Sequence, residues 1–279
     1  MKAKWLLQNN IFDDNFDKFI TELESQGIEY KTVKYIPFES GEYNQFPDND
    51  CVVFYGSLNL ANQLRKQKPW IPGTYYDLEN FKCSIYYNYF GQYLFNDFYM
   101  FMPLTEIIRL RNNNRFLYNF SGTIFIRPDS GFKEFTGQVV STGKPIFNIP
   151  SLETINASKY FDDNIMCVVS SAKHIEREYR IVIADKKVVT GCQYKYKMEL
   201  DVDNDCPKEI IQYAENFAKC EWEPCRVYVM DIAVGLHDNI GLLELNSFSC
   251  SGLYDSDVSK IVKEVSEVAE KEWREYNEV

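Results

Sequence analysis

Apolar residues in the first hundred positions recur with two spacings, one typical of strands and one typical of helices. The continuous run CVVFY at residues 51–55 predicts a buried strand, and after Gly56 and Ser57 the spacing over residues 58–66 predicts a helix. A further helix is predicted over residues 15–26, and short strands at 4–7 and 29–33. This order of strand, turn and helix predicts an α/β lobe.

From residue 122 onward the pattern becomes richer in strands. The predicted strands are 123–127, 165–170, 180–184, 187–192, 226–233 and 241–245, and the predicted helices are 151–160, 206–218 and 258–276. An aromatic-rich stretch at residues 81–101 is interpreted as core packing rather than a stacking surface. We therefore expect an α+β chain, with an N-terminal α/β lobe at residues 1–118 and a second domain at residues 119–279.

Composition and charge argue against several classes of protein. Apolar residues make up 45% and aromatic residues 16% of the 279-residue chain, which predicts a folded protein rather than a disordered one. The formal net charge of -11 argues against general binding to nucleic acid, which requires clustered Lys and Arg. No apolar run reaches the length of about 18 residues that a spanning helix needs. We therefore expect neither a nucleic acid nor a membrane partner.

The eight cysteines and two histidines form no recognisable metal motif. No CxxC pair occurs and histidines are few, which argues against a zinc site. The opening residues lack the basic segment and long apolar core of a signal peptide. We therefore expect reduced thiols in a cytosol-like, cytoplasmic location.

The strongest candidate for chemistry is a pair of strands near the C-terminus. Asp231 lies in one apolar strand, and Glu244 and Asn246 lie two residues apart on the next, after a turn at residues 236–239. Hairpin pairing would bring the three side chains together on one face. Oxygen ligands of this kind suit Mg²⁺ that also holds phosphate oxygens. The structural alternative is a solvated Asp231 and an ion-paired Glu244.

Two further segments combine charge with a turn. In RPDSGFKEFTG, residues 127–137, a strand ends at Arg127 and a turn leads to Lys133, as in a flap over polyphosphate; a hairpin with solvated cations is the alternative. In the segment EYR, Glu178 and Arg180 share a strand face, where they could receive ligand groups or pair with each other.

Taken in order, these pieces resemble the catalytic part of ATP-grasp enzymes. The resemblance is carried by residues 127–137, by EYR at 178–180 with TGCQYK at 190–195, and by MDIAV at 230–234 with LLELNSFSCSGLY at 242–254. More narrowly, they resemble the ATP-grasp clade that is named for one arginine and two lysines and is known largely from bacteria and phages. The cytoplasm would then be that of a bacterium or of a phage-infected host.

The resemblance implies a fold and a set of ligands. It implies two α+β lobes that clasp ATP after the N-terminal lobe, with Mg²⁺ bound by Asp231, Glu244 and Asn246. Arg127 and Lys133 match phosphate-contacting positions, and the strand with Val169 and Ser170 matches the hinge that offers backbone groups to adenine. Glu178 and Arg180 match nucleotide- or substrate-side positions.

Two assignments stay open at this point. The arginine that would hold an acylphosphate is either Arg180 or Arg226. The second lysine that contacts ATP is Lys173, Lys195 or Lys197. The loop at residues 247–254, with Ser249 and Ser251, is a candidate for substrate recognition.

The implied activity is that of a carboxylate–amine ligase. ATP would phosphorylate a carboxylate, and an amine would displace the phosphate, on a peptide, a protein or an amino acid. The alternatives are a nucleotide-binding regulatory module without turnover and a kinase-type phosphotransferase. The sequence leaves the two substrates and the oligomeric state open.

Overall fold

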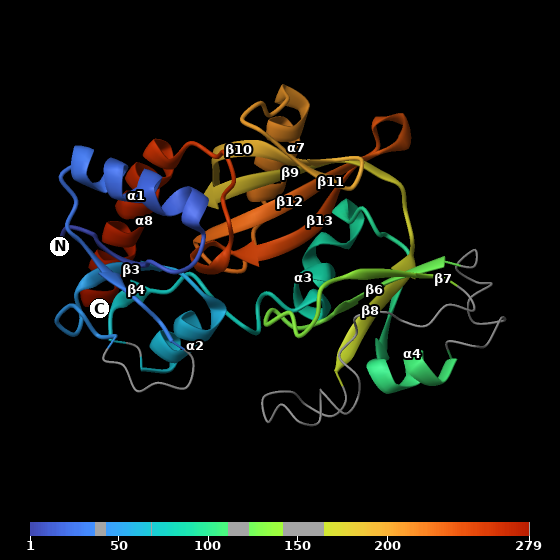
Figure 1. Cartoon of the computed structure of the whole chain (residues 1–279), viewed down its shortest axis with the longest axis horizontal. Helices are drawn as coiled ribbons and strands as arrows, with labels where there is room; N and C mark the ends of the chain where they lie inside the picture. The colour runs from blue at the N-terminus through green and yellow to red at the C-terminus, as the bar shows by residue number, and fades with distance from the viewer. Residues whose placement is uncertain (37–42, 68, 111–122, 142–164, 279) are drawn as a thin grey trace. The chain divides into compact units, whose positions relative to one another are not determined.

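The computed structural model describes residues 1–36, 43–67, 69–110, 123–141 and 165–278 (Figure 1). The chain divides into two compact units. Unit 1 contains residues 1–77, 175–234 and 244–279, and unit 2 contains residues 78–174 and 235–243. The predicted boundary at residues 118 and 119 and the predicted helix at 151–160 lie outside the described residues.

The N-terminal part of unit 1 is a four-stranded sheet with the order β2-β1-β3-β4. Its strands are β1 (Lys4–Gln8), β2 (Tyr30–Val33), β3 (Cys51–Tyr55) and β4 (Ile71–Gly73), and its helices are α1 (Asp13–Ser25) and α2 (Leu58–Gln67). All of the strand pairs are parallel. The α/β pattern that the sequence predicts for this region is confirmed, because the strands alternate with helices.

The second sheet has five strands in the order β11-β10-β9-β12-β13. They are β9 (Ile175–Ala184), β10 (Lys187–Tyr196), β11 (Glu199–Asp203), β12 (Val227–Gly235) and β13 (Ile240–Ser247). The helices of this region are α7 (Lys208–Ala218) and α8 (Val258–Asn277), with short 3-10 segments η2 (Leu236–Asp238) and η3 (Phe248–Cys250). This sheet carries most of the residues that the sequence singles out for chemistry.

One hydrophobic core joins the parts of unit 1. It contains Trp5 of β1, Phe19 of α1, Val229 of β12, Phe248 of η3 and Ile261 of α8. Helix α8 begins at Asp257, whose side chain accepts a hydrogen bond from the backbone N of Lys260. Its buried residues recur at helical spacing, so one face of α8 packs into this core. The shared core gives the five-stranded sheet a rigid support.

Unit 2 has its own antiparallel sheet with the order β5-β8-β6-β7. Its elements are α3 (Cys83–Phe90), η1 (Gly91–Tyr93), β5 (Tyr99–Pro103), α4 (Leu104–Leu110), β6 (Thr123–Pro128), β7 (Gln138–Ser141) and β8 (Met166–Ser171). A separate core includes Leu104, Ile107, Ile126 and Val169. The core-packing interpretation of the 81–101 stretch holds for part of its aromatic residues: the buried ones are Phe81, Tyr86, Tyr87, Phe90 and Phe95, and the exposed ones are Tyr89, Phe98 and Phe101.

The mixture of sheets and helices confirms the α+β class. Within the described ranges, no helix is both long and apolar enough to cross a membrane.

Candidate active site

Asp231 lies in the middle of a hydrophobic strand. Its neighbours on β12 from Val227 to Ala233 are hydrophobic and buried, and Asp231 has no exposed surface. Strands β12 and β13 are neighbours in the sheet and are joined by a short turn, as the spacing predicts. Nδ2 of Asn246 on β13 donates to Oδ2 of Asp231 at 3.0 Å. A carboxylate in such a strand requires a cation or several donors beside it.

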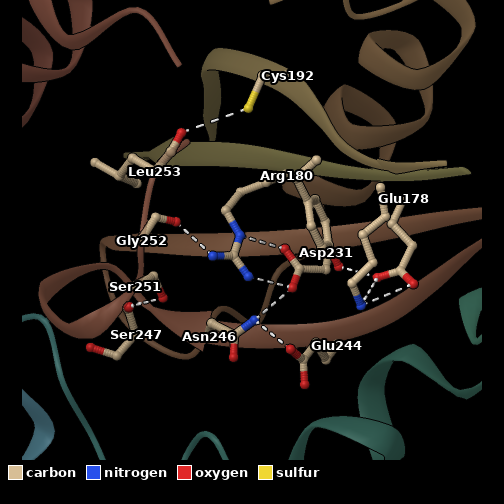
Figure 2. Close-up of polar contacts among 12 residues, drawn as sticks. Glu178, Arg180, Cys192, Asp231, Glu244, Asn246, Ser247, Ser251, Gly252 and Leu253 are labelled. Carbon is tan, nitrogen blue, oxygen red and sulfur yellow. Dashed lines mark hydrogen bonds and ion pairs between the residues drawn. The ribbon is translucent and has the colours of Figure 1, made fainter. Parts of the chain in front are cut away.

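In this structure the cation is the guanidinium of Arg180. Its Nε donates to Oδ1 of Asp231 at 2.9 Å and its Nη2 donates to Oδ2 at 2.7 Å, which makes the pair bidentate (Figure 2). Arg180 comes from β9, the strand next to β12. Burial lowers the pKa of the Arg180 guanidinium, but the charge of Asp231 and its hydrogen bonds raise that pKa further, above its ordinary value. Arg180 therefore stays cationic.

Glu244 joins the same group of side chains. Nδ2 of Asn246 donates to Oε1 of Glu244 at 3.0 Å as well as to Asp231. One amide nitrogen thus bridges two carboxylates, and the amide oxygen of Asn246 points to the other side (Figure 2). The three residues predicted to bind metal therefore meet in one place with Arg180 beside them. The alternative of a solvated Asp231 is wrong, because Asp231 is buried.

Glu178 is held by two consecutive residues of β10. The hydroxyl of Tyr194 donates to Oε2 of Glu178, and Nζ of Lys195 lies 3.4 Å from both carboxylate oxygens. In a regular strand, consecutive side chains point to opposite faces. Here the pairing of β9 with β10 shifts register between Gln193 and Lys195. This β-bulge allows Tyr194 and Lys195 to reach the same carboxylate, and bulges commonly occur next to active sites. We call Glu178, Arg180, Asp231, Glu244 and Asn246 the central cluster.

Two tyrosines pack against Arg180. The rings of Tyr194 and Tyr254 are stacked, with centroids 4.9 Å apart and planes 6° apart. Cζ of Arg180 lies 5.1 Å from the Tyr194 centroid and 5.0 Å from the Tyr254 centroid. Burial raises the pKa of both phenols, so both tyrosines are neutral at physiological pH. Both tyrosines lie in motifs that carry the family resemblance, but no role was predicted for them, because no spacing rule places Tyr254 of the loop beside β10.

The loop after β13 is fixed by its serines. Ser249 accepts a hydrogen bond from the backbone N of Tyr75 at 2.9 Å, and Ser251 donates to the carbonyl oxygen of Ser247 at 2.6 Å. These hydroxyls, which were candidates for substrate recognition, are buried and bind the protein backbone instead. The loop contributes differently to the site: the carbonyl oxygen of Gly252 accepts a hydrogen bond from Nη1 of Arg180 at 2.6 Å.

Arg226 does not join the central cluster. It precedes β12, and its Nη2 pairs with Oε2 of Glu275 on α8. Arg226 and Asp231 are five positions apart along extended chain, which corresponds to roughly 16 Å. Of the two arginines predicted for the acylphosphate, only Arg180 lies beside the predicted metal ligands.

The predicted phosphate-binding residues Arg127 and Lys133 belong to unit 2. Arg127 is buried near the end of β6, so the solvated alternative is wrong for this residue. Lys133 is exposed, with a φ of 54° in the left-handed region. Between them Asp129 binds the first turn of helix α3: its Oδ1 and Oδ2 accept hydrogen bonds from the backbone N and the hydroxyl of Ser84 at 2.6 and 2.7 Å. Part of this segment is therefore structural.

Val169 and Ser170 lie in the middle of the unit 2 sheet. Strand β8 is paired with β5 on one side and β6 on the other. Their backbone groups are therefore engaged by neighbouring strands, which does not favour the prediction that they offer hydrogen bonds to adenine. The Ser170 hydroxyl is buried, and the described residues provide no hydrogen-bond partner for it.

The donor set of the central cluster fits a divalent cation. The described residues hold no group of three or more His, Cys, Asp and Glu side chains arranged for a metal. The predicted set is of another kind, because it consists of two carboxylates and the amide oxygen of Asn246. These hard oxygens match the preference of Mg²⁺, which usually completes its shell with water and phosphate oxygens.

Comparison with protein families identifies the domain. Residues 109–264, more than half of the 279-residue chain, match the model of the ATP-grasp domain, R2K clade family 2. The chain belongs to this family. The match includes every residue of the central cluster and confirms the resemblance that the sequence motifs indicate. No curated protein matches the chain.

Solved structures show the same ATP-grasp fold at low sequence identity. D-alanine–D-alanine ligase from Bacillus anthracis is 14% identical with a TM-score of 0.59, and the alignment covers 99% of both chains. D-cycloserine synthetase DcsG is 8% identical with a TM-score of 0.57, covering 96% of this chain and 99% of that one. The ATP-grasp ligase PsnB, solved with a minimal precursor, Mg and ADP, is 13% identical with a TM-score of 0.54, covering 96% and 98%.

Proposed function

We propose that this ATP-grasp protein is an ATP- and Mg²⁺-dependent ligase that joins a carboxylate to an amine through an acylphosphate. The observation that carries the proposal is the meeting of Asp231, Glu244 and Asn246 on one sheet, with the Arg180 guanidinium bound to Asp231. A module that only bound nucleotide would have little need for two adjacent carboxylates, which attract a divalent cation. The substrates are proposed to be amino acids or peptides, as the names of the similar ligases suggest.

The proposed reaction has two steps. A substrate carboxylate oxygen attacks the γ-phosphorus of ATP and ADP leaves, so that an acylphosphate forms. The amine then attacks the acyl carbon, inorganic phosphate leaves, and the nitrogen loses a proton. Charge spreads over phosphoryl oxygens in the first step and over the acyl oxygen in the second, so cations fixed nearby accelerate both.

The residues of this chain have proposed roles in those steps. Asp231, Glu244 and Asn246 would hold Mg²⁺, which neutralises phosphate charge when it is bound. Arg180 would stabilise the acylphosphate. Lys195 contacts Glu178 of the central cluster and is therefore favoured as the second ATP contact.

In unit 2, Arg127 and Lys133 are proposed to contact phosphates. Ser170 is proposed to border the adenine with its side chain, since its backbone is occupied and the side chain of the adjacent Val169 packs into the core of unit 2.

Hydroxylamine provides the sharpest test, because it traps acylphosphates as coloured hydroxamates whatever the natural amine. The protein would be incubated with ATP, Mg²⁺, hydroxylamine and pools of amino acids or short peptides. We expect hydroxamate and ADP in equal amounts. Glu244→Gln, which removes one charged ligand at the partly exposed edge of the cluster, should lower both rates by about 100-fold or more.

Glu199→Gln is the matched control, because this glutamate is exposed on β11 and makes the same change of charge away from the cluster. It should retain the wild-type rate. ADP with a phosphoester and no hydroxamate would indicate a kinase, and Mg²⁺-dependent ATP binding without any ADP would indicate the regulatory module.

A further inference from the structure

Arg180 occupies the atoms that a metal would need. Both oxygens of Asp231 accept hydrogen bonds from it, at 2.9 Å to Nε and 2.7 Å to Nη2. A divalent cation bound to Asp231 would compete with the guanidinium for the same lone pairs, and two positive charges this close would repel each other. The arrangement without metal therefore differs from the one that a loaded site requires.

Arg180 also has contacts that do not involve Asp231. Nη1 donates to the carbonyl oxygen of Gly252 at 2.6 Å, and the stacked rings of Tyr194 and Tyr254 lie about equally far from Cζ, at 5.1 and 5.0 Å. The position of Tyr254 is fixed in turn, because Nδ2 of the buried Asn15 donates to its carbonyl oxygen at 2.9 Å. These contacts would keep the guanidinium next to the cluster after it leaves Asp231.

We propose that Arg180 is the resident counter-cation of the metal site and that metal binding frees its Nε and Nη2 for an anionic substrate group. Tyr194 and Tyr254 act as positioning residues that hold the guanidinium during this exchange. The inference rests on the proposed function, because it takes Asp231 as a metal ligand. It explains how a carboxylate with no exposed surface is stabilised without metal, and it couples metal binding to the formation of an anion site.

The test measures Mn²⁺ binding without nucleotide, by water-proton relaxation and calorimetry. Arg180→Gln removes the competing cation and should tighten Mn²⁺ binding by about tenfold or more, because the metal then neutralises a carboxylate that has lost its partner. Arg180→Lys keeps the positive charge, but an ammonium group cannot bind both oxygens of Asp231 as the planar guanidinium does. This variant should therefore tighten Mn²⁺ binding by about threefold.

Lys187→Gln is the matched control, because Lys187 carries the same charge on β10, the strand next to β9, but is exposed at the start of that strand. It should change Mn²⁺ affinity by less than about twofold. The inference is overturned if Arg180→Lys binds Mn²⁺ like wild type while Arg180→Gln and Lys187→Gln tighten Mn²⁺ binding equally, since Arg180 would then act only through general charge. If no variant and no wild-type protein bound Mn²⁺, the result would instead contradict the proposed metal site and the proposed function.

Side-chain NMR of the wild-type protein tests the exchange even if the Arg180 variants fold poorly. With ¹⁵N-labelled arginine, addition of Mg²⁺ should shift the Nε signal of Arg180 and speed its exchange with water, while Arg226, paired with Glu275, keeps its signal. An unmoved Arg180 signal under saturating Mg²⁺ would contradict the exchange. Tyr254→Phe should preserve the Mg²⁺-induced shift because it keeps the ring, whereas Tyr254→Ser should broaden the Arg180 signal.

Discussion

Two groups of charged side chains in unit 1, one around Asp231 and one near the start of strand β12, have their hydrogen bonds satisfied to very different degrees. The central cluster joins its members by hydrogen bonds of 2.7 to 3.0 Å around Asp231. The second group, which we call the C-terminal cluster, consists of Tyr75, Glu223, Arg226, Glu272 and Glu275. In it, four buried atoms find no hydrogen-bond partner among the described residues: Oη of Tyr75, Oε2 of Glu223, Nη1 of Arg226 and Oε2 of Glu272.

The comparison shows that buried charge alone does not identify a site. In the C-terminal cluster, burial raises the pKa of Glu272 and of Glu223, so desolvation outweighs the attraction of Arg226 for both carboxylates. In the central cluster, the attraction of Asp231 outweighs burial for Arg180. The difference lies in the geometry of the ion pairs. Two parallel hydrogen bonds between a guanidinium and a carboxylate offset most of the free energy that burial of the two charges costs.

The largest expected effect is the loss of Arg180. Arg180→Ala should lower the free energy of unfolding by about 3–5 kcal/mol, because it leaves Asp231 as an unpaired buried carboxylate. Arg226→Ala, which removes a half-exposed pair with Glu275, should cost about 1 kcal/mol or less. Urea denaturation of both variants measures the difference. The double variant Arg180→Ala/Asp231→Ala should recover part of the loss, and equal losses for Arg180→Ala and Arg226→Ala would contradict the comparison.

The sequence predicts which side chains of the central cluster lie together where strand geometry alone determines their positions. Period-2 alternation puts Glu244 and Asn246 on one face, and a four-residue turn puts Asp231 opposite them, so no knowledge of the fold is needed. The same reasoning could not choose between Arg180 and Arg226. That choice depends on β9 lying next to β12, a pairing between strands that are far apart in sequence.

Features without a periodic signal were missed. Strand β11 is exposed at every residue, so it has no apolar face to reveal it. The bulge at Tyr194 and the left-handed Tyr254, with a φ of 51°, break the local rules from which the prediction was made. Both breaks lie beside Arg180, and departures from local rules are expected at functional sites.

A smaller effect on stability is expected when one tyrosine hydroxyl is removed from each of the two clusters. Tyr194→Phe removes the donor to Glu178 and should lower the free energy of unfolding by about 1–2 kcal/mol, because it deprives a buried carboxylate of a hydrogen bond. Tyr75→Phe removes a buried hydroxyl that interacts with Glu272 but makes no hydrogen bond of normal geometry among the described residues, so stability should stay unchanged or rise slightly. Thermal and urea unfolding compare the two. A larger loss for Tyr75→Phe would show that its hydroxyl is bonded in solution.

The smallest effect concerns the pH dependence of Glu272. Burial raises its pKa above the ordinary value of 4.5, while the nearby Arg226 and Tyr75 act in the opposite direction and Glu275 and Asp185 add to the rise. The folded protein therefore keeps this proton to higher pH than the unfolded chain, and stability falls as pH rises from about 4.5 through the raised pKa.

The glutamine of the Glu272→Gln variant cannot ionise, so the variant does not lose this stability as pH rises. Relative to wild type, it should gain on the order of 1 kcal/mol or less at pH 7.5 and lose this advantage at pH 4. Urea unfolding at the two pH values measures the gain, and Glu264→Gln, on the same helix but outside the C-terminal cluster, is the control. A gain that is equal at both pH values would mean that Glu272→Gln stabilises by packing, and the C-terminal cluster would then be as well satisfied as the central one.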